Sequence, residues 1–282
     1  MRVSIIGFGF VGKAIANALK TDTKLQKIDP KLNTSNENLR DFIPDIIFIC
    51  VPTPMNSDGS QNIDILMDII DDIKSYKLNS LVVIKSTILP SCILKIKESL
   101  PKFVYNPEFL REKHANEDFI NSDIIVFGGD IESSQELASF YDNFFECTNN
   151  DYIFTDLVTA SLVKYSINSF LATKVIFFNE INQLFKKSGA KGDWKDFLKI
   201  LNKDKRIGTS HMEVPGHDGR YGFGGACLPK DSNALVSYAE SMNSELDLLK
   251  TAIKINNKIR KSYNKNTKRE DEQNILFEDL DR

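Results

Sequence analysis

Residues 3–12 read VSIIGFGFVG, and this stretch decides the fold. An apolar β-strand is followed at once by three glycines spaced G-x-G-x-x-G, and then by a predicted helix over residues 13–19. Strand, glycines and helix in this order are the context that a dinucleotide-binding fingerprint requires. Gly7 would allow the tight turn, Gly9 would let a pyrophosphate approach the backbone, and Gly12 would let the helix pack on the strand. The stretch therefore predicts a dinucleotide site.

An acidic residue ends the second predicted strand, residues 25–29, which read LQKID. A carboxylate at this place holds the ribose 2′-hydroxyl of a dinucleotide and repels a 2′-phosphate. Asp29 therefore favours NAD over NADP. We expect the remaining residues of the glycine loop, Phe8, Phe10 and Val11, to line the same cofactor site.

Further apolar strands alternate with helical patterns as far as residue 154. Residues 45–51, 81–84 and 124–129 are nearly continuous apolar runs, which are typical of parallel strands buried on both faces. The pattern predicts an α/β fold with an N-terminal Rossmann-type, doubly wound parallel sheet over residues 1–154. Open sheets of this kind bind ligands at the carboxyl ends of their strands. The residues expected at the cofactor on this ground are Val51, Pro52, Thr53 and Thr87.

The second half of the chain has the pattern of an all-helical central domain over residues 155–261. A long helix is predicted over residues 157–188, which contain no proline or glycine, and a second long helix over residues 232–261. A loop rich in glycine and proline separates them. Residues 262–282 are mostly polar, and we expect a frayed tail or, less readily, a docking helix.

Composition excludes several function classes. The net charge of -3 gives no basis for a dominant nucleic-acid-binding surface. No apolar run reaches the length of a membrane span, and no signal peptide precedes the first strand, so we expect a cytoplasmic protein without a membrane partner. The four cysteines show no C-x-x-C spacing, which predicts neither a disulfide framework nor a metal site.

Cys227 stands out among the cysteines because residues 222–231 read GFGGACLPKD. A thiol that is flanked by glycines and precedes a proline-started helix is open to a small substrate. The helix N-terminus and Lys230 would favour its thiolate, and Asp231 could meet it across one turn. Taken alone, such a cysteine is more often a buried residue beside a turn.

Seven stretches together resemble the UDP-glucose/GDP-mannose dehydrogenase family. They occur in the family's order, cover most of residues 1–260, and read GFGFVG, CVPTP, KST, NPEFLRE, KYSINSFLATKVIFFNE, RIG and FGGACLPKD. The resemblance implies an NAD-dependent oxidoreductase that converts the C6 hydroxymethyl group of a nucleotide sugar, similar to UDP-glucose, to a carboxylate. It also makes Cys227 the expected nucleophile.

The resemblance gives the other catalytic residues. Cys227 would capture the aldehyde as a thiohemiacetal and then carry the thioester that water hydrolyses. Lys164 and Asn168 are four residues apart, so they share one helix face. Lys164 would stabilise the developing alkoxide or act as acid and base, supported by Asn168. Asp231 would position a water or share the proton transfer.

Glu108 and Glu112 are also four residues apart, and on a helix their carboxylates would face the same way. The family assigns this region to thioester hydrolysis, with Thr87 nearby, whereas the plainer alternative is a solvated helix face. Glu112 and Lys230 are also expected at the cofactor. The expected substrate contacts are Glu108, Phe109, Leu110, Lys164, Asn168, Arg206, Arg220 and Gly224, the two arginines for a diphosphate.

Family members normally continue into a third, nucleotide-binding domain, whereas this sequence extends 51 residues beyond Asp231. We therefore expect a short form that lacks the C-terminal UDP-binding domain. It could be an active enzyme, one component of a split enzyme whose partner chain binds the nucleotide, or an inactive remnant. Apolar residues surround the helix at 157–188 too completely for one buried stripe, which, with the resemblance, predicts a homodimer through this helix.

Overall fold

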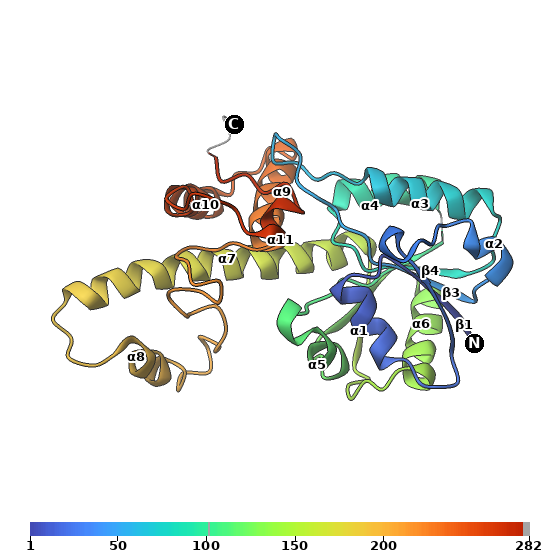
Figure 1. Ribbon diagram of the computed structural model, residues 1–282, viewed down its shortest axis with the longest axis horizontal. Coiled ribbons are helices and arrows are strands. Elements are labelled where there is room, and N and C mark those ends of the chain that lie inside the picture. The colour runs from blue at the N-terminus through green and yellow to red at the C-terminus, as the bar shows by residue number, and fades with distance from the viewer. Residues whose placement is uncertain (101, 279–282) are drawn as a thin grey trace. The chain divides into compact units, whose positions relative to one another are not determined.

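The computed structural model describes residues 1–100 and 102–278 (Figure 1). It divides into two compact units. Unit 1 comprises Met1–Thr53 and Asn62–Lys164, and unit 2 comprises Pro54–Gln61 and the residues from Tyr165 onward. One helix, α7 (Leu157–Lys187), runs from the first unit into the second.

Unit 1 is built on a seven-stranded sheet with the order β2-β1-β3-β4-β5-β6-β7. Strands β1 to β5 are parallel, whereas β6 pairs antiparallel with β5, and β7 runs parallel to β6. The predicted doubly wound sheet is therefore confirmed for its first five strands, and its last two strands run the other way. The bounds are β1 Arg2–Ile6, β2 Lys24–Ile28, β3 Ile46–Ile49, β4 Leu81–Ile84, β5 Val104–Tyr105, β6 Ile125–Gly128 and β7 Tyr152–Thr155.

Helices cover both faces of this sheet (Figure 1). The first group, which includes α1, α5 and α6, lies on one face, and α3 and α4 lie on the other. Short 3-10 turns at Pro30–Leu32 and Glu112–His114 complete the connections. The helices are α1 Phe10–Ala18, α2 Asn38–Phe42, α3 Asp64–Ser75, α4 Pro90–Ser99, α5 Ala115–Ile120 and α6 Ile131–Phe144.

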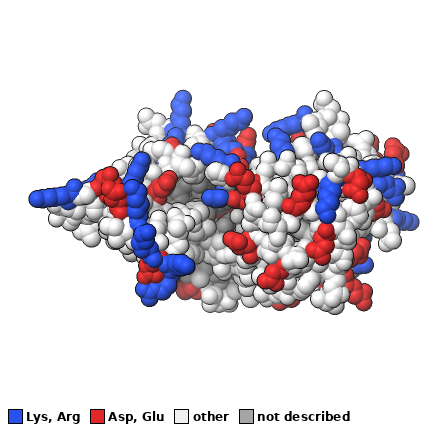
Figure 2. Space-filling model, turned by 90° about the horizontal axis from the view of Figure 1, so that it is seen from below, with Lys and Arg blue, Asp and Glu red and all other residues white. Residues whose placement is uncertain are grey.

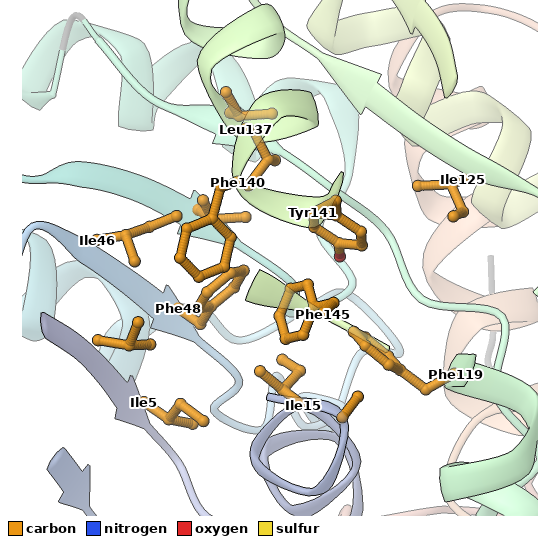
Figure 3. Packing of buried hydrophobic residues seen from close by; sticks show 14 of the residues in the cluster. Ile5, Ile15, Ile46, Phe48, Phe119, Ile125, Leu137, Phe140, Tyr141 and Phe145 are labelled. Atoms are coloured by element: carbon orange, nitrogen blue, oxygen red, sulfur yellow. The ribbon is translucent and has the colours of Figure 1, made fainter. Parts of the chain in front are cut away.

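An aromatic cluster fastens α5 and α6 to the sheet (Figure 3). The ring of Phe145, which follows α6, lies 4.6 Å from that of Tyr141 and 5.2 Å from that of Phe119 in α5. Phe48 of β3 packs against Phe140 and Phe145 at 5.8 and 5.9 Å. Edge-on aromatic pairs stabilise a core by roughly 0.5–1.5 kcal/mol each beyond their area burial. This cluster fixes the frame from which the loops at the strand ends project.

The strand order places a switch point between β1 and β3. The chain leaves β1 towards β2 on one side and returns to β3 on the other. In open α/β sheets such a point opens a crevice at the carboxyl ends of the strands, and ligands bind there. The loops after β1 and β3 flank it.

Unit 2 is helical among its described residues. Its helices are the part of α7 from Tyr165, α8 (Trp194–Leu201), α9 (Leu228–Ser241), α10 (Asp247–Arg260) and α11 (Lys268–Asp271). One core joins α7, α9 and α10, and a second joins α7 to α8 and the following loop. The expected helical region after the sheet is confirmed.

Two expectations for this region are wrong. The single helix expected over residues 232–261 is two helices, α9 and α10, because Asn243 adopts a left-handed conformation with φ 55° and ends the first. Asparagine tolerates this conformation better than most residues. In place of the frayed tail there is a short helix, α11, and Ile275 and Phe277 are buried within unit 2, which fits the alternative of a docking helix. The last four residues of the expected tail lie outside the described residues.

Candidate active site

The glycine loop after β1 has the open form that a pyrophosphate needs. Gly7 donates its N–H to the Ile28 carbonyl at 2.8 Å and has φ +88°, a conformation that favours glycine. A Cβ at Gly12 would collide with the Gly7 carbonyl oxygen. Beside Gly9 the space is open, and α1 begins there without a side-chain cap. The first turn of a helix presents backbone N–H groups to an anion, and the open space beside Gly9 leaves room for one. These residues fit NAD.

Asp29 ties this loop to the end of β2. Its carboxylate accepts hydrogen bonds from the backbone N–H of Phe8 at 2.7 Å and of Lys31 at 2.8 Å. Carboxylate oxygens accept more than one hydrogen bond each, so capacity for ribose hydroxyls remains. The position of Asp29 beside the glycine loop suits the ribose role that we predict for it.

The loops after β3 and β4 are joined by a threonine. Thr53 is buried, and its hydroxyl donates to the Thr87 carbonyl at 2.8 Å. Val51 is buried as well, whereas Pro52 is exposed. Thr87 is half-buried. The predicted cofactor residues of both loops therefore lie together at the carboxyl edge of the sheet.

Glu108 and Lys164 form a buried pair within unit 1. The Lys164 ammonium lies 3.2 Å from Oε1 of Glu108 and also donates to the Glu108 carbonyl oxygen. The other carboxylate oxygen of Glu108 accepts the N–H of Leu110 at 2.7 Å. Both side chains are buried, and Lys164 lies over the Phe109 ring, with its Nζ 5.4 Å from the centroid. The structure thus brings four of the expected substrate residues together.

The expected helical pairing of Glu108 with Glu112 is wrong. Residues 106–111 are not helical, and Glu112 is exposed at the start of a 3-10 turn. Asn106 precedes Pro107, and a residue before proline is disfavoured in the helical region. The side-chain amide of Asn106 also donates to the Val126 carbonyl at 2.9 Å, which holds the segment extended.

The sequence did not predict the buried hydrogen-bonded cluster around Lys85, although the KST motif contains this residue. Lys85 is buried, and its ammonium donates to the side-chain oxygen of Asn106 at 2.8 Å. Tyr141 donates to the same oxygen at 2.7 Å. Burial lowers the pKa of Lys85 from 10.5 to about 8 and raises the pKa of the nearby Cys50 to about 12. A lysine directly after an apolar strand was the signal for this cluster.

Cys227 occupies the N-cap position of α9 in unit 2, without a side-chain capping hydrogen bond. Its carbonyl accepts the N–H of Asp231 at 2.9 Å, and its side chain is half-buried. The Asp231 carboxylate is buried and accepts hydrogen bonds from Lys230 and from the amide of Asn168, each at 2.6 Å. Lys230, which we expected at the thiolate and the cofactor, is thus bonded to Asp231.

The two arginines expected at a diphosphate have different surroundings. Arg206 is exposed and pairs with Asp204 at 2.5 Å. The carbonyls of the next two residues accept hydrogen bonds from the buried Lys174, whose pKa is lowered by burial. Arg220 instead lies over the Tyr263 ring and donates to the Lys265 carbonyl at 2.9 Å. These local contacts compete with the phosphate role predicted for Arg220.

The helix α7 carries two side chains that each hold a buried carboxylate, one within each unit. Lys164 and Asn168 are one turn apart on it, and each holds one acid, Glu108 and Asp231 respectively. Buried charges are stable only when paired and hydrogen-bonded. Lys164 balances the charge of Glu108, whereas Asp231 has Lys230 as its charge partner and Asn168 as a neutral donor.

On the face drawn in Figure 2, basic and acidic side chains are interspersed among uncharged ones. None of the described helices is both long and apolar enough to cross a membrane. Within residues 1–100 and 102–278, His, Cys, Asp and Glu side chains form no cluster suited to a metal ion.

Two family models match the chain. The NAD binding domain of the UDP-glucose/GDP-mannose dehydrogenase family matches residues 29–145, and the central domain of the same family matches residues 158–258.

Individual relatives are similar over large parts of the chain. The UDP-glucose 6-dehydrogenase of Rickettsia bellii is 38% identical over 230 residues, which cover 78% of this chain and 50% of the relative. The UDP-glucose 6-dehydrogenase of Rickettsia prowazekii is 35% identical over 92% of this chain and 65% of its own length. The chain thus spans between half and two thirds of these curated relatives.

A solved structure has a similar fold. The UDP-glucose dehydrogenase of the archaeon Pyrobaculum islandicum superposes with a TM-score of 0.71 at 27% identity. The match covers 90% of this chain and 67% of that one.

Proposed function

This chain belongs to the UDP-glucose/GDP-mannose dehydrogenase family, and from that premise we propose that it oxidises the C6 hydroxymethyl group of a nucleotide sugar of the UDP-glucose type to a carboxylate. The observation that carries the proposal is the placement of Lys164 and Asn168 one turn apart on α7, each hydrogen-bonded to a buried carboxylate. NAD, when bound, would accept two electrons in each of two oxidations. We further propose domain boundaries at residues 154 and 261, with residues 262–282 as a separate C-terminal segment.

The proposed chemistry uses Cys227 as the covalent residue. Its thiol adds to the C6 aldehyde, with the thiol proton passing to the carbonyl oxygen, and forms a thiohemiacetal. Oxidation of that adduct gives a thioester, and water cleaves the carbon–sulfur bond to release the carboxylate and return the thiol. Cys227 at the N-cap of α9 suits this role because a helix N-terminus favours the thiolate.

Lys164 and Asn168 are proposed to act on the reacting oxygen. Lys164 is held by Glu108 in a buried setting, where a cationic donor stabilises a developing alkoxide more strongly than in water. Asn168 would donate a hydrogen bond while its amide also orients Asp231. For thioester hydrolysis we propose Glu108, which is buried, ahead of Glu112, which is exposed.

A homodimer through α7 belongs to the same proposal. Phe170, Phe177 and Leu184 recur every seven residues on this helix, and their side chains are 65%, 55% and 62% exposed. Seven-residue spacing keeps side chains on one helix face. Such an apolar stripe fits a second copy of the chain. Light scattering at micromolar concentration should give the mass of a dimer, and Phe177→Glu should give the 32.0 kDa monomer.

The test is NAD reduction by the purified chain with a panel of nucleotide sugars. We expect two NADH for each carboxylate formed. Cys227→Ser should lower carboxylate formation at least about a thousandfold while NAD binding persists, because loss of a covalent nucleophile removes most of the rate enhancement. Cys147→Ser is the matched control and should keep full activity.

The other outcomes of the panel are also informative. Full four-electron turnover by Cys227→Ser would overturn the thioester mechanism. Turnover only after a second polypeptide is added would make the chain one component of a split enzyme. NAD binding without turnover under either condition would make it an inactive member of the family.

A further inference from the structure

The C-terminal segment 266–277 packs against the glycine-rich loop that precedes Cys227, residues 222–226. The segment begins with a capping box, in which Thr267 and Glu270 exchange hydrogen bonds around α11. Ile275 and Phe277 bury its second half. The match to the family's central domain ends at residue 258, so this segment lies beyond the matched residues.

Glu270 makes the direct contact with the loop. Its side chain is fully buried. Its Oε1 accepts hydrogen bonds from Nη2 of Arg260 at 2.5 Å and from the backbone N–H of Gly225 at 3.1 Å. Its Oε2 accepts the N–H of Thr267 at 2.6 Å and lies 3.8 Å from Nη1 of Arg220. The carboxylate thus accepts three hydrogen bonds and has a second arginine close by, so it is firmly held.

The charges around Glu270 balance. Arg260 is almost fully buried and also pairs with Asp218 at 2.8 Å. Its guanidinium lies over the rings of Phe277 at 5.3 Å and Tyr263 at 5.7 Å. Two arginines and two acids therefore neutralise one another, so this cluster holds structure together rather than offering a site for an anion.

The loop is shaped to receive these groups. A Cβ at Gly224 would collide with the Arg260 guanidinium and the Glu270 carboxylate. Earlier in the loop, the Asn179 side chain accepts the N–H of Gly222, and the Asn256 side chain bonds both backbone groups of Phe223. Glu270 holds this loop at Gly225, two residues before Cys227.

We propose that Glu270 is a positioning residue for Cys227, and that the segment 266–277 clamps the loop 222–226 and so fixes the thiol at the start of α9. The proposal concerns the orientation of the nucleophile, and its link to turnover rests on the function proposed above. Gly225 has φ +80°, a conformation that favours glycine, and its hydrogen bond to Glu270 holds the backbone two residues before Cys227.

The first test is the alkylation rate of each cysteine by iodoacetamide, measured peptide by peptide. In Glu270→Gln we expect the rate at Cys227 to rise at least fivefold, because the half-buried thiol becomes more accessible when the loop opens. The rates at Cys92 and Cys147 should stay unchanged. Glu272→Gln is the matched control, since Glu272 lies in the same segment and pairs with Arg269 at the surface at 2.5 Å.

Two further measurements test the proposal even if Glu270→Gln does not fold. Amide hydrogen exchange in the parent chain should show Gly225 protected, because its N–H is bonded to a buried carboxylate. Phe277→Ala loosens the segment without removing a charge, and it should speed exchange in residues 222–226 and alkylation of Cys227 together. Fast exchange at Gly225 in the parent chain would overturn the proposal.

Other outcomes decide the remaining cases. Equal alkylation of Cys227 in a folded Glu270→Gln, or a parallel rise at all four cysteines in both Glu270→Gln and Phe277→Ala, would also overturn it. If the chain turns over a nucleotide sugar, Glu270→Gln should lower kcat at least tenfold and leave the KM for NAD unchanged. Because alkylation and exchange need no substrate, a chain without dehydrogenase activity still tests the clamp.

Discussion

The two glycine-rich loops of this chain, residues 7–12 and 222–226, both lead into a helix but reach their shapes by different routes. The first is held by partners about twenty residues away, such as Asp29 at a separation of 21. The second is held by side chains at separations of 43, 33 and 45 residues. Beside Gly9 the space is open, whereas beside Gly224 it is filled by two buried charged groups.

This difference follows from what each loop does in the proposed function. A loop that receives a cofactor leaves room for it beside its glycines, and such a loop is recognisable from its own residues. A loop that orients one side chain must have its backbone held by contacts with other parts of the protein. Its glycines provide space for the protein itself, and distant residues supply the packing.

The largest expected effect tests the loop 222–226, in which buried charged groups fill the space beside Gly224 (the filled loop). Gly224→Ala should lower the free energy of unfolding by about 3–5 kcal/mol, because the new Cβ separates the buried Arg260–Glu270 pair. Gly225→Ala is the matched control. It has open space around its Cβ and should cost only about 1–2 kcal/mol, for its left-handed conformation. Chemical denaturation of both variants measures the difference, and equal losses would contradict the filled-loop interpretation.

The second effect concerns Lys85, the buried cation that follows β4 at the carboxyl edge of the sheet. The folded state lowers the pKa of Lys85 from 10.5 to about 8, so unfolding takes up a proton between these pH values. The unfolding free energy of the parent chain should therefore rise with pH in this window relative to Lys85→Met, by up to about 1.4 kcal/mol per pH unit.

Denaturation midpoints at pH 7, 8, 9 and 10 check this prediction. Taking the difference between parent and variant removes the opposite contribution of Cys50, whose pKa is raised to about 12. A difference that is flat across the window would mean that Lys85 is not destabilised by burial.

The third prediction tests the contact between Asp29 and the glycine loop 7–12. Asp29→Ala should raise the Kd for NAD about ten- to a hundredfold, since hydrogen bonds to a charged group contribute ~1.5–3 kcal/mol, and should narrow the preference over NADP. Asp29→Asn keeps an acceptor for the Phe8 N–H but loses the charge, so it separates the tether from the ribose contact. Unchanged discrimination in both variants, measured by titration, would remove the ribose role.

The smallest expected effect on stability is that of Gly9→Ala. Its Cβ meets nothing within 4 Å, so the free energy of unfolding should change by no more than about 0.5 kcal/mol. NAD affinity should nevertheless fall at least about tenfold, because the methyl group occupies the space that the pyrophosphate needs. Calorimetric titration beside thermal unfolding provides both readouts. A loss of stability as large as that of Gly224→Ala would abolish the contrast between the loops.

The same contrast explains what could be predicted from the sequence. The strand–glycine–helix order, the apolar strands and the long helix are local patterns that predicted the fold and the cofactor loop, whereas the resemblance to the family supplied most of the catalytic and substrate residues. The end of α9 was missed because Asn243, with neither glycine nor proline beside it, makes the left-handed turn. The extended form of residues 106–111 could have been anticipated from Pro107.

The partners of the buried charged side chains could not be predicted from local sequence patterns. Lys85 meets Asn106 and Tyr141, and Glu270 meets Arg260 and Gly225, only after the chain has folded back on itself. In the sequence, Glu270 stands in the charged run KREDE, which is typical of a solvated segment. The packing around it depends on Gly224 having no side chain, a feature visible only in three dimensions.

The dependence of the second loop on Glu270 also sets an order in time. Domains generally fold from the N-terminus during synthesis, and the glycine loop after β1 has its partners within the first fifty residues. The loop before Cys227 cannot take its final shape until residue 270 has been made. The nascent chain can therefore complete its cofactor-binding loop early, while the nucleophilic cysteine is among the last groups to be set in place.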